Sequence, residues 1–432
     1  MALLVHSGQD RWQSLRHLFV IPMVLPPIVV AVIWKLIYTP DISPIFHTAK
    51  ALGFMLPAFT SHADFALAAI VVADTWEWAP FTYLMVLAAL QNLPGEYVEA
   101  ARMDGANALR VFQHIVLPYI APVLMVCTLF RLIDSIKAFP LIFLITGGGP
   151  GSARPSPMKT TRYKRPGHVT TWAVPLLLFL MLLPFLWLLQ MSFKPTPMIL
   201  EFPPRLLFMP TVEHYVGLWQ GGFPESFVNS LITSGVSTLL ALVIGVPAAY
   251  ALSRWSDRGR FGLGLSILLT RMAPPIAFTI PFFLAYRYLG LLDTRTGLIL
   301  IYMTFNLPLV IWMMQPFFDA VPASLEEAAL MDGAGFPTVF AEIVMPMASA
   351  GIAATAILCF LYAWNDFFFA LILTRTDART APVAVVNFMN YEGWEWGKIA
   401  AGGSLVMAPV LLFSLMVRRY LVSGLTAGAV KG

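Results

Sequence analysis

The residues that could carry chemistry do not form a catalytic pattern, but one short motif occurs twice. The seven histidines are scattered, and neither an HExxH pattern nor a nucleophile elbow is present. The two cysteines, Cys127 and Cys359, lie inside apolar runs, which argues against a disulfide, a metal site or a redox pair. The repeated motif is EAARMDGA from Glu99 and EAALMDGA from Glu327. We therefore expect no catalytic residue and no bound metal.

Each copy of the motif lies in a polar stretch between two apolar runs, at residues 94–118 and 322–346. A proline opens each stretch, where the first turn of a helix does not use its N–H groups. Gly105 and Gly333 follow the aspartate of the motif and are natural helix stops, because glycine adopts a left-handed conformation at little steric cost. A second short helix is expected to run on to the next apolar run. We predict two helix-turn-helix loops that project into the aqueous phase.

The elements around the loops are predicted to span a membrane. The chain has 432 residues, of which 58% are apolar and 12% charged, and this is too hydrophobic for an ordinary globular protein. The net charge of +4 is spread over short clusters, so nucleic-acid binding is not expected. Runs of about 20 apolar residues, the length that crosses a bilayer, occur at about residues 18–38, 65–90, 116–145, 172–193, 231–252, 261–284, 297–318, 347–373 and 399–420. We predict an all-α, polytopic membrane helical bundle with about nine transmembrane helices.

Several apolar runs contain prolines, among them the pairs Pro26–Pro27 and Pro274–Pro275. Inside a membrane protein, neighbouring helices and polar groups can satisfy the carbonyl groups that a proline leaves without a partner. We therefore expect these prolines to lie within spans.

The two halves of the chain repeat each other. Residues 80–146 align without a gap on residues 308–374, at a constant offset of 228 (327 − 99). The matches are densest at the motif. The repeat predicts two homologous modules, residues 1–157 and residues 158–432.

The motif and its surroundings resemble the signature loop of the permeases of bacterial ABC importers. The first copy matches this signature at Glu99, Ala100, Ala101, Gly105, Ile115, Leu117 and Pro118. The second copy has Glu327, Ala328, Ala329 and Gly333 and differs only in having Met345 before Pro346. The resemblance implies that each loop is a cytoplasmic coupling helix that docks on a separate ATP-binding subunit. It further implies that Glu99 and Glu327 pair with a basic residue there and that Gly105 and Gly333 form the turn.

Two further segments resemble carbohydrate importers. The C-terminal YLVSGLTAGAVKG from Tyr420 is similar to the tail of permeases of the maltose and glycerol 3-phosphate type, and TGGGPG from Thr146 is similar to their partner subunit. The resemblance implies a bacterial inner-membrane permease, with two cytoplasmic ATP-binding subunits, an extracytoplasmic sugar-binding protein and a second permease as partners. No GxxxxGK[ST] loop is present, so the chain is expected to bind no cofactor and to leave ATP hydrolysis to its partners.

Three charged residues in one apolar run fall on one helix face. Arg131, Asp134 and Lys137 recur at intervals of three, so they can share that face as a neutralised string. Charges within spans usually pair with one another or face a cavity. We favour structural pairing over contact with a substrate.

In the second module, the corresponding run reads LYAWNDFFF and resembles a Trp-Asn-acidic-Phe pattern of sugar permeases. Aromatic faces with amide groups suit a sugar, so Tyr362, Trp364 and Asn365 are candidates for the substrate path. Aromatic residues are also common at membrane interfaces, which leaves a structural role open. Asn306 on the preceding run is a weaker candidate, because such a residue often packs helices together.

The first module departs from the pattern that the resemblance implies. Permeases of this type have about six spans per module, and the second module supplies six apolar runs whereas the first supplies three. Counting the crossings then places the two loops on opposite sides of the membrane and leaves the basic segment at residues 159–165 outside, against the positive-inside tendency. Our hypothesis is that a truncated first permease is joined to a complete second one, with Met158 as the original start of the second.

An ion-coupled secondary transporter is the alternative function. Such a protein needs no ATP-binding subunit and more often shows inverted repeats and broken helices. The repeat here runs in one direction and is densest outside the predicted spans, which favours the ATP-driven importer. The sequence does not indicate which sugar, polyol or phosphodiester is carried.

Overall fold

The computed structural model describes residues 19, 21–60, 63–91, 93, 95–136, 139–146, 170–201, 205–255, 259–272, 275–390 and 393–427. These residues are helical or irregular except for one antiparallel ladder, in which β1 (Met389–Asn390) pairs with β2 (Gly393–Trp394). The predicted all-α fold is confirmed. Internal contacts divide the chain into two units, Met1–His214 (unit 1) and Tyr215–Gly432 (unit 2).

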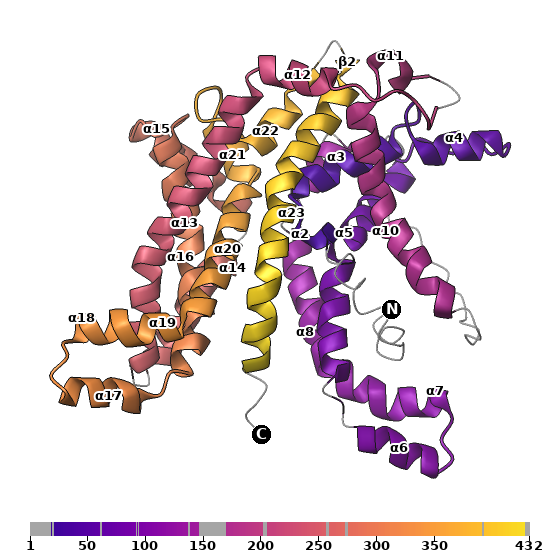
Figure 1. Ribbon diagram of the computed structural model, residues 1–432. Coiled ribbons are helices and arrows are strands. Elements are labelled where there is room, and N and C mark those ends of the chain that lie inside the picture. The colour runs from indigo at the N-terminus through magenta and orange to yellow at the C-terminus, as the bar shows by residue number, and fades with distance from the viewer. Residues whose placement is uncertain are drawn as a thin grey trace. The chain divides into compact units, whose positions relative to one another are not determined.

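Unit 1 is organised around a short, buried helix. Its elements are α2 (Ile21–Val24), α3 (Pro27–Tyr38), α4 (Pro44–Ala51), α5 (Ala63–Gln91), α6 (Gly95–Met103), α7 (Ala108–Val111), the π-helical turn η3 (Phe112–Val116), α8 (Leu117–Ile136), α9 (Phe139–Thr146), α10 (Thr170–Phe193) and α11 (Thr196–Ile199) (Figure 1). Every residue of α3 from Ile28 to Trp34 is buried. Lys35 of α3 donates to the carbonyl of Ile145 in α9 at 2.8 Å, and Tyr38 donates to the carbonyl of Ala69 in α5 at 2.9 Å. The first bond ties α3 to α9, and the second ties α3 to α5, the helix that leads into the first loop.

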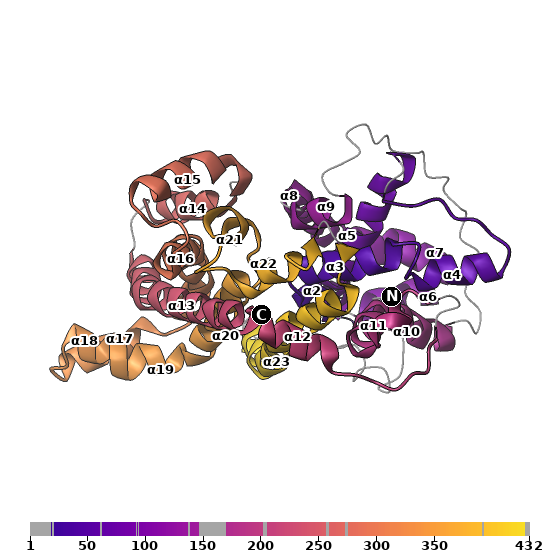
Figure 2. The same ribbon diagram turned by 90° about the horizontal axis from the view of Figure 1, so that it is seen from above.

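Unit 2 is built on two long helices that lie side by side. Its elements are α13 (Phe223–Arg254), α14 (Gly259–Met272), the 3₁₀ turn η4 (Pro275–Phe278), α15 (Thr279–Tyr288), α16 (Arg295–Asp319), α17 (Ala323–Met331), α18 (Phe336–Val339), the π-helical turn η5 (Phe340–Val344), α19 (Met345–Met347), α20 (Ser349–Trp364), α21 (Phe368–Leu373), α22 (Ala381–Val386) and α23 (Trp396–Ala427) (Figure 2). The helix α12 (Glu213–Gln220) crosses the boundary between the units. A Cβ on Gly245 of α13 would lie 2.7 Å from Cγ1 of Val310 in α16. Glycine therefore permits the close approach of these two helices, as small residues do in membrane bundles.

Four helices in the described part of the chain are long and apolar enough to cross a membrane. Their apolar segments are Leu176–Phe193, Phe223–Arg254, Arg295–Asp319 and Trp396–Phe413. A fifth crossing is formed if Phe336–Met347 and Ser349–Trp364, which meet at a bend of 76°, count as one span. The chain is thus a multi-pass membrane protein, whereas the predicted number of nine spans is not confirmed.

The pair Pro26–Pro27 accounts for part of the difference between predicted and observed spans. The run at residues 18–38 is interrupted before Pro27, which begins α3. In the run at residues 261–284, α14 ends at Met272 and η4 begins at Pro275, while residues 273–274 lie outside the described residues. Two adjacent prolines remove two N–H groups and clash with the preceding turn, so the helix breaks. Single prolines, such as Pro80 in α5 and Pro247 in α13, remain inside their helices as expected.

The division by contacts differs from the two predicted sequence modules. Helix α10 belongs by sequence to the second module, but it packs against α3 and α5, where the rings of Trp76 and Phe185 lie 5.0 Å apart. The contact boundary therefore falls after His214, beyond the predicted module boundary. Met158 and the basic segment at residues 159–165 lie outside the described residues. The module boundary stays a prediction.

Candidate functional site

The two motif loops have the same turn. In the first, the N–H of Asp104 donates to the carbonyl of Ala100 at 3.0 Å and that of Ala106 to Ala101 at 2.9 Å. In the second, the same two bonds join residues exactly 228 positions later, both at 3.0 Å: Asp332 to Ala328 and Ala334 to Ala329. Both turns therefore close with the same hydrogen-bond pattern.

A glycine with positive φ lies at the centre of each turn. The φ angle is 78° at Gly105 and 89° at Gly333. A Cβ at either position would meet no atom within 4 Å. Glycine is therefore needed at both positions for its backbone conformation and not for space.

The return path of each loop is also repeated. After the turn, a four-residue helix (α7 or α18) leads into a π-helical turn of five residues, η3 at Phe112–Val116 and η5 at Phe340–Val344. The two π-helical turns are again 228 residues apart. Such turns are rare and often occur at functional sites. Each loop is thus one folded unit rather than a chance motif.

The inner face of each loop packs on the end of the preceding long helix. In unit 1, one apolar cluster joins the loop to α5; its members include Leu87, Leu90, Ala101, Ala106, Val111 and Val116. In unit 2, the equivalent cluster joins the loop to α16; its members include Met314, Phe318, Ala329, Ala334, Val339 and Val344. The alanines of the motif at 101 and 329 are therefore part of the loop's packing.

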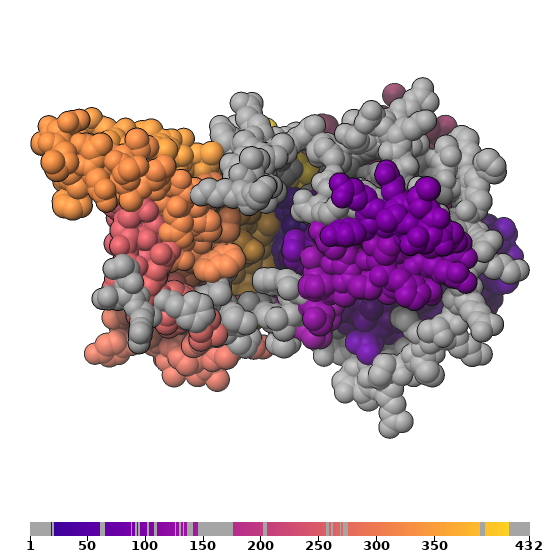
Figure 3. All heavy atoms as spheres, turned by 90° about the horizontal axis from the view of Figure 1, so that it is seen from below, coloured from indigo at the N-terminus to yellow at the C-terminus, as the bar shows by residue number. Residues whose placement is uncertain are grey.

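The outer faces of the loops are exposed and partly apolar. Glu99 and Ala100 are exposed in the first loop, and Glu327 and Ala328 are exposed in the second. The methionine of the motif is almost fully exposed in both copies, at 87% for Met103 and 88% for Met331. Figure 3 shows the second loop, α17 to α19, protruding from the rest of unit 2. Exposed apolar side chains on a protruding element indicate a contact surface for a partner.

One residue of the second loop was not predicted from the sequence. Glu326, the residue before the motif, is only 7% exposed and accepts hydrogen bonds from Nε of Arg254 at 3.0 Å and from the hydroxyl of Tyr250 at 2.5 Å. Burial alone would raise the pKa of Glu326, but the hydrogen bonds from Arg254 and Tyr250 outweigh it and hold that pKa below its usual value. The signal that could have identified it is the pair Glu326–Glu327. The first copy of the motif has a glutamate at only the second of these positions, Glu99.

The candidate substrate-path residues of unit 2 lie in different environments. Trp364 is 1% exposed and donates to the carbonyl of Val406 in α23 at 3.1 Å, and Asn306 is 3% exposed and donates to the carbonyl of Cys359 in α20 at 3.1 Å. Both contacts hold helices together. Tyr362 is exposed and Asn365 is half-buried. The contacts of Trp364 and Asn306 favour helix packing, and the substrate-path role of all four residues stays a prediction.

The charged string in unit 1 pairs both within and beyond its own helix. Arg131 of α8 lies 3.8 Å from Asp134, as the spacing predicts, and it also forms an ion pair with Asp74 of α5. Its guanidinium carbon lies 4.9 Å from the centre of the Trp78 ring. Lys137 lies outside the described residues. These contacts favour the structural interpretation of Arg131.

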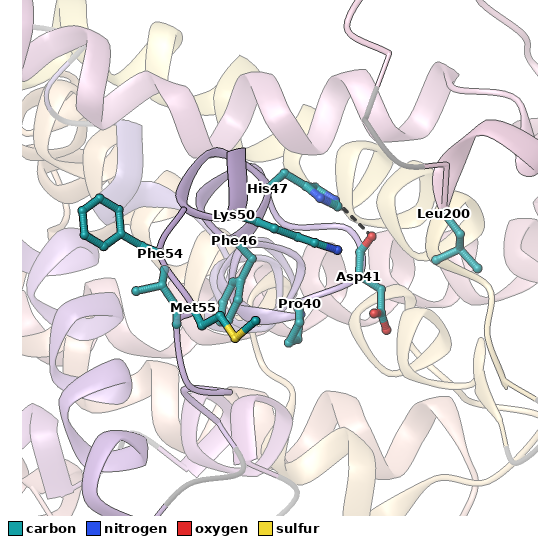
Figure 4. A pocket seen from close by; sticks show the side chains of 9 residues that line it. Pro40, Asp41, Phe46, His47, Lys50, Phe54, Met55 and Leu200 are labelled. Carbon is teal, nitrogen blue, oxygen red and sulfur yellow. Dashed lines mark hydrogen bonds between the residues drawn. The ribbon is translucent and has the colours of Figure 1, made fainter. Parts of the chain in front are cut away.

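A cavity of about 500 Å³ lies elsewhere in unit 1, beside α4. Its lining includes the polar residues Asp41, His47 and Lys50, and Nε2 of His47 lies 3.1 Å from the carbonyl oxygen of Asp41 (Figure 4). The apolar part of the lining consists of Pro40, Phe46, Phe54, Met55, Leu56 and Leu200. Among the described residues, no group of three or more His, Cys, Asp or Glu side chains is arranged to hold a metal ion.

Comparison with known proteins gives a consistent result. The model of one family, the binding-protein-dependent transport system inner membrane component, matches residues 6–193 and again residues 241–425. The trehalose transport system permease protein SugB of Mycobacterium tuberculosis is 41% identical over 275 residues, which cover 61% of this chain and 98% of that protein. The probable ABC transporter permease protein y4oR of Sinorhizobium fredii is 39% identical over 261 residues, 60% of this chain and 93% of that protein.

A solved structure is similar over a comparable length. It is that of a bacterial ABC transporter involved in the import of the acidic polysaccharide alginate, with a TM-score of 0.51 and 26% identity over 60% of this chain and 99% of the matched chain. The family match covers most of the sequence, in two separate segments, and agrees with the membrane-spanning helices and the repeated loops. The chain belongs to the family of binding-protein-dependent transport system inner membrane components.

Proposed function

We propose that the chain is the permease of an ATP-driven carbohydrate importer, and that its two motif loops dock on separate cytoplasmic ATP-binding subunits. The observation that carries this proposal is the repetition of one loop geometry 228 residues apart, with the same turn, the same π-helical turn and an exposed methionine in each copy. Two loops of one design suit two copies of one partner. ATP hydrolysis and nucleotide binding belong to those partners.

The chemistry of the outer face suits docking into a cleft. In the second loop, an exposed carboxylate at Glu327 lies among exposed apolar side chains, Leu325, Met331 and Phe336. The exposed Ala328 beside it lets another surface approach closely. A partner with an apolar cleft and a basic residue inside it would complement this surface, and the buried contacts would exclude water from the ion pair.

Two observations support a sugar as the substrate. The relative from Mycobacterium tuberculosis is a trehalose permease by name, and the similar solved structure belongs to an alginate importer. Of the four candidate residues, Tyr362 is exposed and Asn365 is half-buried, whereas Trp364 and Asn306 are buried, so a sugar can reach the first two more readily. We propose that Tyr362 and Asn365 contact the sugar, with a soluble extracytoplasmic binding protein delivering it.

The docking proposal is tested by reversing the charge of the motif glutamate. Glu327→Lys is introduced into the full chain, which is coexpressed with candidate ATP-binding subunits, and co-purification and ATP-dependent uptake are measured. The matched control is Glu225→Lys, an exposed glutamate near the other end of α13, about 40 Å along the helix axis from Arg254. We expect Glu327→Lys to reduce both readouts and Glu225→Lys to leave them intact. Unchanged complex formation and uptake in Glu327→Lys would contradict the proposal.

The substrate and the energy source are tested together. Uptake of labelled trehalose, maltose, glycerol 3-phosphate and alginate oligosaccharide is measured in proteoliposomes that contain the permease, the ATP-binding subunits and the binding protein. Uptake of one of these that requires enclosed ATP is expected. Uptake that continues without ATP and collapses when an ion gradient is removed would instead indicate the secondary transporter.

We also propose that the chain joins two permease modules at residues 157 and 158. The support is the double family match and the length of the relatives, since the 275 residues aligned with the trehalose permease amount to nearly the whole of that protein. Resequencing the coding region for residues 149–158 and weighing the expressed product test this. One full-length protein with an unaltered reading frame that transports as such would refute the idea of two originally separate chains.

A further inference from the structure

The second loop is attached to the spanning helices by a cluster that the coupling motif does not include. Tyr250 and Arg254 lie at the end of α13, and Glu326 lies in the first turn of α17. The hydroxyl of Tyr250 donates to Oε2 of Glu326 at 2.5 Å, while Nε and Nη2 of Arg254 both donate to Oε1. We refer to these three residues as the Arg254 joint.

The guanidinium of Arg254 uses all of its donor groups. Besides Glu326, its Nη1 donates to the hydroxyl of Ser253 at 3.3 Å and to the carbonyl of Phe318 at 3.2 Å, and its Nη2 donates to the carbonyl of Val321 at 3.0 Å. The five N–H groups of an arginine thus meet five hydrogen bonds. A side chain with that many directional contacts has little freedom to change its geometry.

Two of these acceptors belong to the connection between α16 and α17. Helix α16 ends at Asp319 and α17 begins at Ala323, so the carbonyls of Phe318 and Val321 lie at the end of one helix and just before the other. Helix-end carbonyls have no partner inside the helix and are favoured sites for arginine. Arg254 therefore ties three elements together: the end of α13, the end of α16 and the start of α17.

The joint connects the second loop to the ends of the membrane-spanning helices α13 and α16, so a displacement of the loop acts on these helices through the joint. Hinges in proteins are a few residues in loops or at the ends of elements, so a short connection between two helices can bend where no other contacts hold it. We propose that Arg254 is a positioning residue that makes this connection rigid, so that displacement of α17 by a docked ATP-binding subunit moves α13 and α16 with it. This inference rests on the proposed docking function. It assigns to Arg254, Tyr250 and Glu326 a role in transmitting movement that is distinct from binding the partner.

A neighbouring ion pair provides a matched control. Arg260 of α14 donates to both carboxylate oxygens of Asp319 at 2.8 Å, at the same end of the unit. Its side chain is 36% exposed and that of Asp319 is 44% exposed, compared with 10% for Glu326. Exposed pairs of this kind contribute little to stability. Arg260→Gln removes an arginine close to the joint without removing a contact to α17.

The direct test measures the distance between spin labels on the two sides of the joint. Cysteines are introduced at Ser324 of α17 and Thr304 of α16, both exposed, in the full chain purified with its ATP-binding subunits; both native cysteines are buried. We expect one narrow distance distribution of the same width with and without ATP. Arg254→Gln should broaden it, and Arg260→Gln should not. A distribution in Arg254→Gln as narrow as in the parent protein would overturn the proposal.

Two milder variants cover the case in which Arg254→Gln does not fold. Arg254→Lys keeps the charge but loses the planar fork and two of the five donors, so an intermediate width is expected. Tyr250→Phe removes only the hydroxyl that donates to Glu326 and should broaden the distribution slightly. Parent-like widths in both variants would also overturn the proposal.

A functional measurement separates positioning from mere stability. With trehalose as the probe, we expect sugar uptake per ATP hydrolysed to fall roughly fivefold or more in Arg254→Gln, while the ATP-binding subunits still co-purify. Uptake, hydrolysis and co-purification that fall in parallel would indicate a structural role and reject the proposal. Failure of the docking proposal has a different signature. In that case Glu327→Lys leaves co-purification unchanged, whereas the distances between the spin labels still report on the rigidity of the joint.

Discussion

The first and second motif loops share a backbone but are attached to their units in different ways. At the position where the second loop has Glu326, the first has Val98, which packs as a partly buried residue in the apolar cluster at the end of α5. The second loop is held by the same kind of apolar cluster and by the Arg254 joint. Apolar contacts hold the loop against its unit but do not fix its orientation, because they are non-directional. Hydrogen bonds from a guanidinium fix both the position and the orientation of the loop. The shape of a loop and its rigidity are therefore specified by different residues.

The largest expected effect comes from making the second loop like the first. Glu326→Val leaves two donors of the partly buried Arg254 without an acceptor, and breaking an ion pair with a buried partner in this way costs on the order of 3 kcal/mol of unfolding free energy. Val98→Ala in the first loop removes two partly buried methyl groups and should cost only about 1 kcal/mol. Unfolding in mixed detergent micelles, followed separately for each variant, measures the two values.

A paired substitution checks the cause of that loss. In the double variant Glu326→Val with Arg254→Met, neither charge remains, and we expect most of the stability lost in Glu326→Val to return. The width of the label distribution between α17 and α16 should nevertheless stay broad, because no directional contact has been restored. Equal stability of the single and double variants would show that the ion pair is not the source of the difference between the loops.

The turn glycines should respond alike in both loops. Gly105→Ala and Gly333→Ala each place a Cβ on a residue with positive φ, which costs roughly 1–2 kcal/mol. No neighbouring atom would contact the added carbon at either position, so the cost is conformational. Resistance of each loop to limited proteolysis in the folded protein reports the effect. A clear loss in only one loop would break the structural equivalence on which the comparison depends.

A side-chain cap distinguishes the second helices of the two loops. In the first, the N–H of Arg110 donates to Oδ1 of Asn107 at 3.0 Å; in the second, the equivalent residue is Gly335, which has no side chain to cap α18. Asn107→Ala should therefore destabilise the first loop by about 1 kcal/mol. The complementary change Gly335→Ala removes no side-chain cap and should cost less than Asn107→Ala. Hydrogen exchange at the N–H groups of α7 and α18 measures both.

The features predicted correctly from the sequence are those set by residues close together in the chain. The helix-turn-helix at residues 94–118 and 322–346 depends on a proline, a glycine and the short polar segment between them. The all-α, membrane-spanning fold likewise follows from runs of apolar residues. A single stretch of sequence is enough to specify each of these elements.

What the sequence did not predict depends on partners far apart in the chain. Arg254 and Glu326 are separated by 72 residues, and Arg131 and Asp74 by 57. Neither pair can be recognised from spacing along one helix. The effect of proline was also misjudged: single prolines such as Pro80 and Pro247 remain within their helices, but the pair Pro26–Pro27 coincides with a break before α3. Candidate path residues such as Trp364 were chosen by residue type. The indole N–H of Trp364 in fact donates to the carbonyl of Val406 in another helix.

The smallest expected effect is a pH dependence confined to the second loop. Burial raises the pKa of Glu326, but the hydrogen bonds from Arg254 and Tyr250 lower that pKa by more than burial raises it. The folded-state pKa therefore lies below the ordinary value of 4.5. The stabilisation is therefore fully present above about pH 4.5 and is lost as the pH falls through the lower, folded-state pKa. Val98 gives the first loop no equivalent. As the pH is lowered from about 6 towards 4 and below, limited proteolysis should accelerate more in the second loop than in the first. Glu326→Gln should abolish that difference, and a difference that persists in Glu326→Gln would assign the pH dependence to another group.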